Sequence, residues 1–422
     1  MRLSVLRLLI VGVLLCLAPW PAAQAAMPGW SFHRDGAVAQ LGERPRALAA
    51  DMDPGPMKDQ LLACEGRPMR WAEFSIGHRG APLRFPEHTL ESYTAAARMG
   101  AGIVECDVTF TKDRELVCRH AQDDLHTTTN VVTIPELNAK CTQPFVPAVP
   151  SEGKPAQAEC RTSDFTLAEF KSLQGKTDDV NPMATTPDAY INAGPRPSAR
   201  GTLLSHRESI RLLKTLGVGF APELKTPVVA MPYEGDYTQE GFARQMIAEY
   251  RSEGVPPEAV RPQSFRLADI LFWLDQANEF GQRAALLNMD EPTPLNTSLI
   301  AMAKLKALGV NAVAAPLWKL LALDDQGHIV PSRYARNARM AGLALIAWTV
   351  ERSGSLAGGG GWYYQSVAQA INNDGDMFAV IDALAREVGV VGIFSDWPAT
   401  TTFYANCTGL VGPSRRPFLN IE

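Results

Sequence analysis

The most constraining feature of this sequence is a repeated alternation of short apolar runs with amphipathic stretches. The apolar runs have the length and the β-branched or aromatic content of buried strands. Nine runs qualify as strand candidates: Phe74–Gly77, Ile103–Val108, Leu116–His120, Gly219–Leu224, Val260–Phe265, Ala284–Asn288, Ala312–Ala315, Leu343–Val350 and Val390–Ser395. Helical stretches separate most of them, among them Thr89–Arg98, Glu208–Leu216, Leu267–Asn278, Ser298–Leu308 and Met377–Val388.

Strand–helix alternation predicts an α/β fold, with a parallel sheet and helices packed on its outside. We expect a TIM (β/α)8 barrel, although nine strands are one more than that barrel holds. The join from Val108 to Leu116 is too short for a crossover helix. The pattern is therefore irregular between the second and third candidates, and one candidate is not a barrel strand.

Composition and charge exclude several classes of protein. The chain has 422 residues, 46% of them hydrophobic and 20% charged, as in a globular protein. This length fits one barrel with insertions, and two or three domains would fit it as well. The formal net charge is −5 and no run of Lys or Arg breaks the balance, so we expect no nucleic-acid partner.

The first 25 residues are typical of a secretory signal peptide. Arg2 and Arg7 precede a short apolar run, and Ala23-Gln24-Ala25 offers the small residues of a cleavage site. The run is too short to span a bilayer core of roughly 30 Å, although an uncleaved N-terminal anchor is the alternative. No later stretch is apolar enough for a transmembrane anchor. We expect an exported protein, either periplasmic or secreted.

The rest of the chain divides into three predicted parts. An N-terminal extension covers 26–70, the barrel covers 71–405 and a C-terminal tail covers 406–422. A polar, Pro-rich insertion at about 130–203 follows the third strand candidate. A second irregular stretch, Arg352–Tyr364, holds four consecutive glycines followed by Trp362 and two tyrosines. These aromatic side chains could contact a lipid surface transiently or could pack inward.

Six cysteines remain in the mature chain, which is an even number in an oxidising compartment. Six cysteines allow 15 disulfide connectivities. Cys141 and Cys160 lie together in the insertion and are the pair that we expect to be joined. Their bridge would close a loop of about twenty residues and stabilise the fold by about 3 kcal/mol.

Charged side chains gather where several predicted strands end. Glu105 and Asp107 are alternate residues of one apolar strand, so their carboxylates project to the same side, roughly 7 Å apart. Two anions on a buried face repel each other unless a cation or a proton lies between them. A solvent-facing edge would explain the pair without a ligand, but the flanking residues are apolar.

Further polar residues end the other strands. Glu223 and Lys225 are again alternate residues, and an ion pair alone would explain them. His78 and Arg79 follow one strand and His120 ends another. A lone histidine at a strand end is more often structural than catalytic. Because the C-terminal strand ends of a barrel share one rim, we expect all seven charged and histidine residues to meet there.

This set of side chains suits hydrolysis of a phosphodiester. Three carboxylates offer only oxygen ligands, which fit Ca²⁺ or Mg²⁺. Arg79 and Lys225 would bind an anion beside the metal, and phosphate is the natural candidate. Two histidines that titrate near neutral pH would supply a general acid and a general base. Phosphoryl transfer at a diester needs all of these parts.

The same residues lie in motifs that resemble the glycerophosphodiester phosphodiesterase family. The first motifs are His78-Arg79-Gly80, Pro86-Glu87-His88-Thr89, Gly102-Ile103-Val104-Glu105-Cys106-Asp107-Val108, Thr111-Lys112-Asp113 and His120. The later motifs are Glu223-Leu224-Lys225, Gln263-Ser264-Phe265, Trp348-Thr349-Val350 and Ser395-Asp396-Trp397-Pro398. The resemblance covers about 74–398 in order, and the linked set is highly specific.

The resemblance implies a TIM barrel that hydrolyses a small-molecule glycerophosphodiester to sn-glycerol 3-phosphate and an alcohol. It also implies an insertion after the third strand, as found here, and one divalent metal, for which we expect Ca²⁺ ahead of Mg²⁺. It assigns His78 and His120 as the acid/base pair, Glu105, Asp107 and Glu223 as metal ligands, Arg79 as the phosphate-binding arginine, Lys225 as the active-site lysine and Trp348 as the wall against which glycerol packs.

Three positions depart from the family pattern. His88 stands where the family usually has Asn, which puts the hydrogen bonding at the following helix start in question. Ala121 stands where an Asp commonly follows the second histidine, and Arg114 stands where a turn usually has Gly. None of the three removes a predicted ligand or acid/base residue, so we expect activity.

Alternatives remain open for the function and for the nucleophile. Phospholipase D-like or lysophospholipase D activity on lipid head groups would use the same site. A binding or wall-associated protein on a decayed barrel would be expected to have lost ligands, and here the set is complete. The nucleophile is either water or the glycerol 2-hydroxyl, which would form a cyclic phosphate that water then opens.

Overall fold

The computed structural model describes residues 38–64, 66–193 and 199–411. The signal peptide predicted over 1–25 lies outside these residues, as do parts of the predicted extension and tail. Along the described ranges, no helix has both the length and the apolar character needed to cross a membrane.

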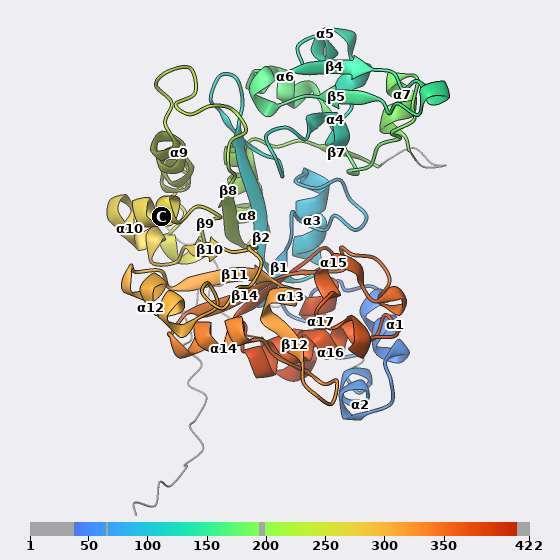
Figure 1. Cartoon of the computed structure of the whole chain (residues 1–422), viewed down its shortest axis with the longest axis vertical. Helices are drawn as coiled ribbons and strands as arrows, with labels where there is room; N and C mark the ends of the chain where they lie inside the picture. Colours follow the sequence, from blue (N-terminus) through green and yellow to red (C-terminus); the bar gives the residue numbers. More distant parts are fainter. Residues whose placement is uncertain (1–37, 65, 194–198, 412–422) are drawn as a thin grey trace, which may run out of the picture.

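Eight parallel strands form a closed barrel, which confirms the predicted TIM fold (Figure 1). Their order is β1-β15-β14-β11-β10-β9-β8-β2, and the pairing of β1 with β2 closes the ring. The strands are β1 (Ala72–Gly77), β2 (Ala101–Phe110), β8 (Gly219–Leu224), β9 (Gln263–Ser264), β10 (Ala285–Leu287), β11 (Ala312–Pro316), β14 (Ala344–Val350) and β15 (Gly392–Ser395). All ten residues of β2 are buried, as expected for a strand covered on both faces.

Helices cover the outside of the barrel, and all five predicted helices are present. They are α3 (Leu90–Arg98), α8 (His206–Leu216), α9 (Gln239–Ser252), α10 (Leu267–Gln276), α11 (Asn278–Gly281), α12 (Leu299–Ala307), α14 (Arg333–Met340), α16 (Asp376–Asp382), the π-helical η7 (Ala383–Val388) and α17 (Ala399–Thr408). Local sequence sets their ends. Ser205 and Glu208 form a capping box at the start of α8, and Gly217 ends that helix in the left-handed conformation.

The ninth strand candidate is β3 (Leu116–Cys118), which pairs antiparallel with β2 and is not part of the ring. The turn from Phe110 to Leu116 is too short for a crossover, so the chain can only turn back as a hairpin. The expectation that His120 ends a parallel barrel strand was therefore wrong. His120 reaches the rim because β2 continues past the rim and the hairpin then brings the chain back to it.

The insertion between β3 and β8 folds around a core of its own. Fourteen buried apolar residues, from Val117 to Leu203, form a cluster separate from the barrel core. In Figure 1 the insertion is the green lobe at the top, beyond β2. Its elements are α4 (Leu125–Thr128), η1 (Val131–Thr133), α5 (Pro135–Asn138), β4 (Gln143–Val146), η2 (Pro150–Glu152), β5 (Gln157–Glu159), η3 (Thr162–Asp164), α6 (Leu167–Ser172), β6 (Gln174–Lys176), α7 (Pro187–Ile191) and β7 (Arg200–Thr202).

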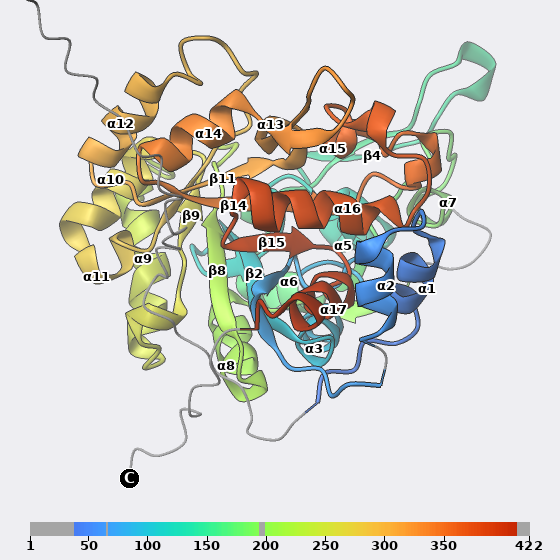
Figure 2. The same cartoon turned by 90° about the horizontal axis from the view of Figure 1, so that it is seen from below.

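Other short elements lie before the barrel and in the loops between its strands. Helices α1 (Arg44–Asp51) and α2 (Pro56–Leu62) pack beside α17, as the view from below shows (Figure 2). The remaining elements are η4 (Pro257–Ala259), α13 (Leu317–Leu320), β12 (Leu321–Leu323), β13 (Ile329–Pro331), η5 (Leu356–Gly358), α15 (Gly361–Tyr364) and η6 (Ala368–Ala370).

Three disulfides join the six cysteines. The predicted Cys141–Cys160 bridge is confirmed and lies in the insertion. Cys64–Cys407 ties the N-terminal helices to α17 across 343 residues of sequence. Cys106–Cys118 joins β2 to β3 within the hairpin.

Candidate active site

The three predicted carboxylates meet at the mouth of the barrel. Glu105 and Asp107 lie on the same side of β2, and Asp107 is the register partner of Glu223 on the adjacent strand β8. All three residues are buried, and one oxygen of each lies within 4.8 Å of the others. The predicted convergence of these residues is therefore confirmed.

The electrostatics of this cluster fit a hard cation. Burial, with repulsion from Asp107 and Glu223, raises the pKa of Glu105 well above its usual value. Burial also raises the pKa of Glu223 to about 7, although Lys225 lies 2.6 Å from its carboxylate. The Oδ1 atom of Asp107 is buried and has no hydrogen-bond partner within the described part of the chain. Three oxygen ligands, crowded and incompletely partnered, suit Ca²⁺ or Mg²⁺.

Asp107 differs from its two neighbours because it stays ionised. Burial opposes ionisation, yet Lys225, His88 and Arg79 hold the pKa of Asp107 well below its usual range. The His88 ring contacts Asp107 at 3.0 Å and the Tyr93 hydroxyl at 2.9 Å. His88, the departure from the family pattern, therefore contacts a carboxylate of the site, and Thr89 caps α3 in the usual way.

His78 follows β1 and is held by a carboxylate from the neighbouring strand end. Its Nδ1 atom lies 2.5 Å from Asp396, which follows β15. Its Nε2 atom lies 3.8 Å from Glu105 and faces the carboxylate cluster. Burial lowers the pKa of His78 to about 4, even though Asp396 favours the charged form.

His120 reaches the same rim from the hairpin. The backbone N–H of Arg119 donates to the carbonyl oxygen of Asp107 at 2.8 Å, which holds the returning chain against β2. A ring nitrogen of His120 lies within 4.8 Å of carboxylate oxygens of Glu87 and Asp124. Burial, followed by the positive charges of Arg79 and Lys225, lowers the pKa of His120 well below its usual value.

Arg79 reaches the carboxylates through a left-handed backbone conformation with φ +56°. Its side chain lies 2.9 Å from Glu87 and 3.5 Å from Asp107, and its backbone N–H donates to Glu105. Gly80 follows at φ +94°, and any Cβ there would collide with Ser92 of α3. The tight turn after β1 therefore aims Arg79 at the cluster.

The structure adds site residues to which sequence analysis assigned no role. Asp396 and Glu87 lie within the recognised motifs and hold His78 and Arg79. Gln263 donates to Glu105 at 2.8 Å. Arg352 lies outside the recognised motifs, and its guanidinium group lies 2.8 Å from the Asp396 carboxylate and 3.6 Å from the Glu87 carboxylate. Only folding places Arg352 here, because its neighbours in space are remote in sequence.

Aromatic side chains occupy the other part of the mouth. Half-buried Trp348 on β14 contacts Phe265, Trp362 and Tyr363 with ring centroids 5.9 to 6.3 Å apart. Trp318 on α13 contacts Trp362 at 5.5 Å. We call these five residues the aromatic wall. Trp362 is 45% exposed and Phe265 is 37% exposed, so the wall is partly open to solvent.

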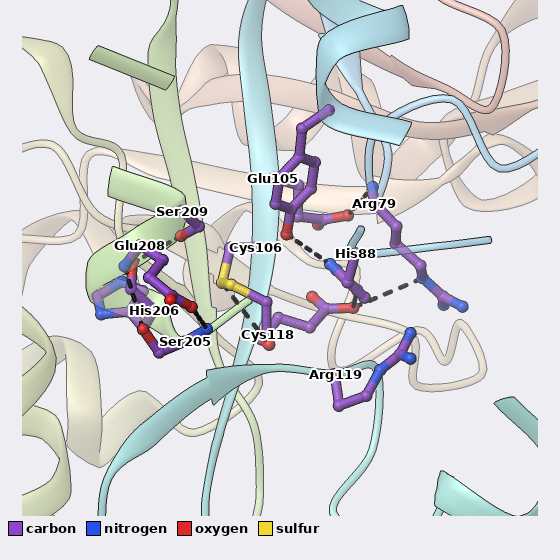
Figure 3. Close-up of a disulfide and its surroundings, with 12 residues drawn as sticks. Arg79, His88, Glu105, Cys106, Cys118, Arg119, Ser205, His206, Glu208 and Ser209 are labelled. Carbon is purple, nitrogen blue, oxygen red and sulfur yellow. Dashed lines mark hydrogen bonds and ion pairs between the residues drawn. A yellow bond between two sulfur atoms is a disulfide. The ribbon is translucent and has the colours of Figure 1, made fainter. Parts of the chain in front are cut away.

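A disulfide lies directly behind the site. Cys106 stands between Glu105 and Asp107, and Cys118 stands two residues before His120. In Figure 3 the bridge lies on the side of β2 that faces Ser205 and His206, and Glu105 and Arg79 lie on the other side. The bond therefore links β2, which carries the carboxylates, to β3, which His120 follows two residues later.

Comparison with known proteins identifies relatives of the chain. The model of the "Glycerophosphoryl diester phosphodiesterase family" matches residues 78–400. An "Extracellular protein" of Arthroderma benhamiae is 43% identical over 244 residues, which are 55% of this chain and all of that protein. The "Glycerophosphodiester phosphodiesterase" of Bacillus subtilis is 32% identical over 125 residues, which are 28% of this chain and 41% of the bacterial protein.

A solved structure gives the same fold. A protein from Silicibacter pomeroyi, provisionally assigned as a glycerophosphoryl diester phosphodiesterase, aligns with 83% of this chain and 98% of its own. The TM-score is 0.55 and the sequence identity is 19%, so this likeness concerns the fold alone.

Proposed function

Because the chain belongs to the glycerophosphoryl diester phosphodiesterase family and is an enzyme of this class, we propose that it hydrolyses glycerophosphodiesters to sn-glycerol 3-phosphate and an alcohol with the help of a divalent metal. One observation carries the proposal. Three buried carboxylates lie at the barrel mouth together with two histidines and two cations, Arg79 and Lys225. These side chains are the ones that metal-assisted hydrolysis of a phosphodiester requires.

Glu105, Asp107 and Glu223 would hold the metal, and we expect Ca²⁺ ahead of Mg²⁺. A bound divalent ion would neutralise charge on the phosphate oxygens and hold the diester in place. The free Oδ1 atom of Asp107 and the raised pKa values of the two glutamates support this assignment. Carboxylates that repel one another when ionised gain most from a cation between them.

The two histidines take different parts in the reaction. The carboxylate of Asp396 accepts a hydrogen bond from Nδ1 of His78, so the Nε2 atom is free to take a proton from the nucleophile. His120 would protonate the departing alcohol. Its pKa is lowered by burial, Arg79 and Lys225, while Asp107 and Glu87 favour the charged imidazole. A bound phosphate anion would raise the pKa of both rings.

Trp348 and the cations position the two ends of the retained product. Arg79 and Lys225 would bind phosphate oxygens, where a planar guanidinium can make two parallel hydrogen bonds. Trp348 would pack against the glycerol carbons. Its indole Nε1 is buried and has no acceptor among the described residues, so it is available to a glycerol hydroxyl group.

Export of the protein is part of the proposal. Three disulfides are typical of a protein that matures outside the cytoplasm, and the relative from Arthroderma benhamiae is named an extracellular protein. We propose a periplasmic or secreted enzyme.

The test is release of glycerol 3-phosphate from glycerophosphocholine by the purified chain with Ca²⁺, Mg²⁺ or EDTA. We expect release with Ca²⁺, weaker release with Mg²⁺ and none with EDTA. Glu105→Gln should shift the metal titration to higher concentration. Equal release in EDTA by the wild type and the variant would contradict the metal assignment.

The aromatic wall favours a second candidate, which is lysophospholipase D activity. The wall extends well beyond Trp348, and a three-carbon glycerol would cover only part of it. An acyl chain on the glycerol would cover the exposed faces of Phe265 and Trp362. Saturable turnover of lysophosphatidylcholine in preference to glycerophosphocholine would support this candidate, and the opposite preference would reject it.

A further inference from the structure

A cavity of about 190 Å³ adjoins the charged side of the active site. The turn after β1 contributes Pro82, Leu83 and Phe85, and the insertion contributes Thr177 and Asp178 on another wall. Glu87, Glu351, Arg352 and Asp396 complete the lining. None of the residues of the aromatic wall lines this space, so it is separate from the subsite proposed for glycerol.

The cavity lies where a departing alcohol would leave the phosphate. Glu87 lines it and also lies beside His120, the proposed proton donor to the alcohol. The attacking and leaving oxygens of a phosphoryl transfer lie roughly in line, so the alcohol needs a space of its own beside the acid. The insertion thus supplies one wall of this space.

The charges of the lining are not balanced. Glu87 and Asp396 are already compensated, because Glu87 lies near both Arg352 and Arg79, and Asp396 lies near Arg352 and contacts the His78 ring. Asp178 is exposed and makes no direct ion pair within the ranges that the structure describes, although it lies close enough to Lys176 to favour the charged form of that lysine. The insertion wall therefore carries a carboxylate that is only partly compensated.

A second observation points to a hydrogen-bond donor as the ligand. The Oε1 atom of Glu87 is buried and has no hydrogen-bond partner in the described chain, and the whole residue is 3% exposed. The nearest cation to this atom is Arg119, at 3.9 Å, which is too long for a hydrogen bond. A buried acceptor left without a donor is costly, so a ligand that donates to it is favoured.

We propose that this cavity is a leaving-group subsite that selects an alcohol carrying a primary ammonium group, as in glycerophosphoethanolamine. The ammonium would donate to Glu87 and face the carboxylate of Asp178, and its short carbon chain would lie on Leu83 and Phe85. A quaternary ammonium carries the same charge but cannot donate a hydrogen bond, and Phe85 is the single aromatic ring in the lining. This inference rests on the proposed phosphodiesterase activity and adds to it a selectivity for the leaving alcohol.

The test compares kcat/KM for glycerophosphoethanolamine, glycerophosphocholine and glycerophosphoglycerol, which is neutral at its leaving end. The wild type should prefer them in that order. Asp178→Asn should lower kcat/KM for the ethanolamine diester roughly fivefold, the size expected for one partly exposed charge pair, and should leave the glycerol diester unchanged. Asp179→Asn is the matched control, because Asp179 is the next residue, is also exposed and does not line the cavity.

Two results would overturn the subsite. One is equal kcat/KM for all three diesters in the wild type, and the other is an equal loss in the Asp178 and Asp179 variants. Calorimetric binding of the three diesters to the EDTA-treated protein separates this inference from the proposed function. Tighter binding of the ethanolamine diester that Asp178→Asn abolishes would support the subsite even if no diester were hydrolysed, and equal binding would reject it even if all were.

Discussion

The two sides of the barrel mouth are built from opposite kinds of side chain. The side over β15, β1, β2 and β8 holds a cluster of carboxylates, two histidines and three cations, nearly all buried and paired with one another. The side over β9, β11 and β14 holds the aromatic wall, whose rings contact each other and remain partly exposed. Both sides sit on carboxyl strand ends of one ring, where the fold places functional loops.

The two sides of the mouth therefore contribute differently to the stability of the fold. Buried charges are costly to desolvate, and leaving one unpaired destabilises a fold strongly. The free oxygen of Asp107 is a cost that a metal would remove. The aromatic wall gains from burial with or without a ligand. We therefore expect changes on the charged side to act mainly on kcat, and changes on the aromatic side to act mainly on KM.

The largest effect should come from the histidines of the charged side. His78→Ala and His120→Ala should each lower kcat at least 10²-fold, because each removes one proton transfer from the reaction. Steady-state hydrolysis of glycerophosphocholine in Ca²⁺ measures the change. His206→Ala, in a buried histidine that pairs with Glu249 away from the mouth, is the control for folding. Near-normal kcat in both site variants would remove the acid/base assignment.

The next largest effect should come from the bridge behind the charged side. Replacing Cys106 and Cys118 by alanine should reduce the free energy of unfolding by about 3 kcal/mol and lower kcat about tenfold or more, because His120 loses its fixed position. Urea unfolding and steady-state kinetics measure the two changes.

The Cys141–Cys160 bridge is the matched control for that experiment. It spans 19 residues against 12 for the hairpin bridge, so the two should cost similar stability when removed. Its loss should leave kcat unchanged, because it lies in the core of the insertion. An equal fall in kcat for both pairs would mean that the hairpin bridge has no special role in placing His120.

A smaller effect is expected on the aromatic side. Trp348→Ala should raise KM about tenfold with little change in kcat, because it removes contact with the glycerol end rather than a proton transfer. Trp362→Ala should change KM less for glycerophosphocholine, because Trp362 is more exposed. If Trp348→Ala lowered kcat as strongly as the histidine variants do, the expectation that the aromatic side acts mainly on KM would be wrong.

The smallest effect concerns pH and stability. The pKa of Glu223 is raised to about 7 in the folded chain, so between its ordinary value of 4.5 and 7 the folded state binds a proton that the unfolded state does not. Glu223 therefore stabilises the metal-free fold at low pH, and this contribution is lost as the pH rises through about 7, by at most about 1.4 kcal/mol per pH unit.

Urea unfolding in EDTA at pH 5 and pH 7.5 tests this contribution. His78 acts in the opposite sense, because its pKa is lowered, so the informative quantity is the difference between the wild type and Glu223→Gln. The free energy of unfolding of the wild type minus that of Glu223→Gln should fall on going from pH 5 to pH 7.5, and the same difference measured in a Trp348→Ala background should fall equally. A difference that does not depend on pH would mean that Glu223 titrates normally.

Much of the fold and the site could be predicted because the signals are local. Hydrophobic periodicity marks all eight barrel strands, and alternation within β2 places Glu105 and Asp107 on one face. The motifs name His78, Arg79 and Trp348 directly. The insertion was harder to interpret, because its short elements and Pro-rich sequence carry little periodicity, yet fourteen apolar residues still form its core.

The sequence by itself determined the barrel and the residue types at the strand ends, because each depends on neighbours within a few positions. Tertiary structure decided which remote segments meet. It joined Cys64 to Cys407, and brought Asp396 to His78 and Arg352 to Glu87. Contacts between residues hundreds of positions apart depend on how the ring of strands closes, and no local pattern in the chain encodes that closure.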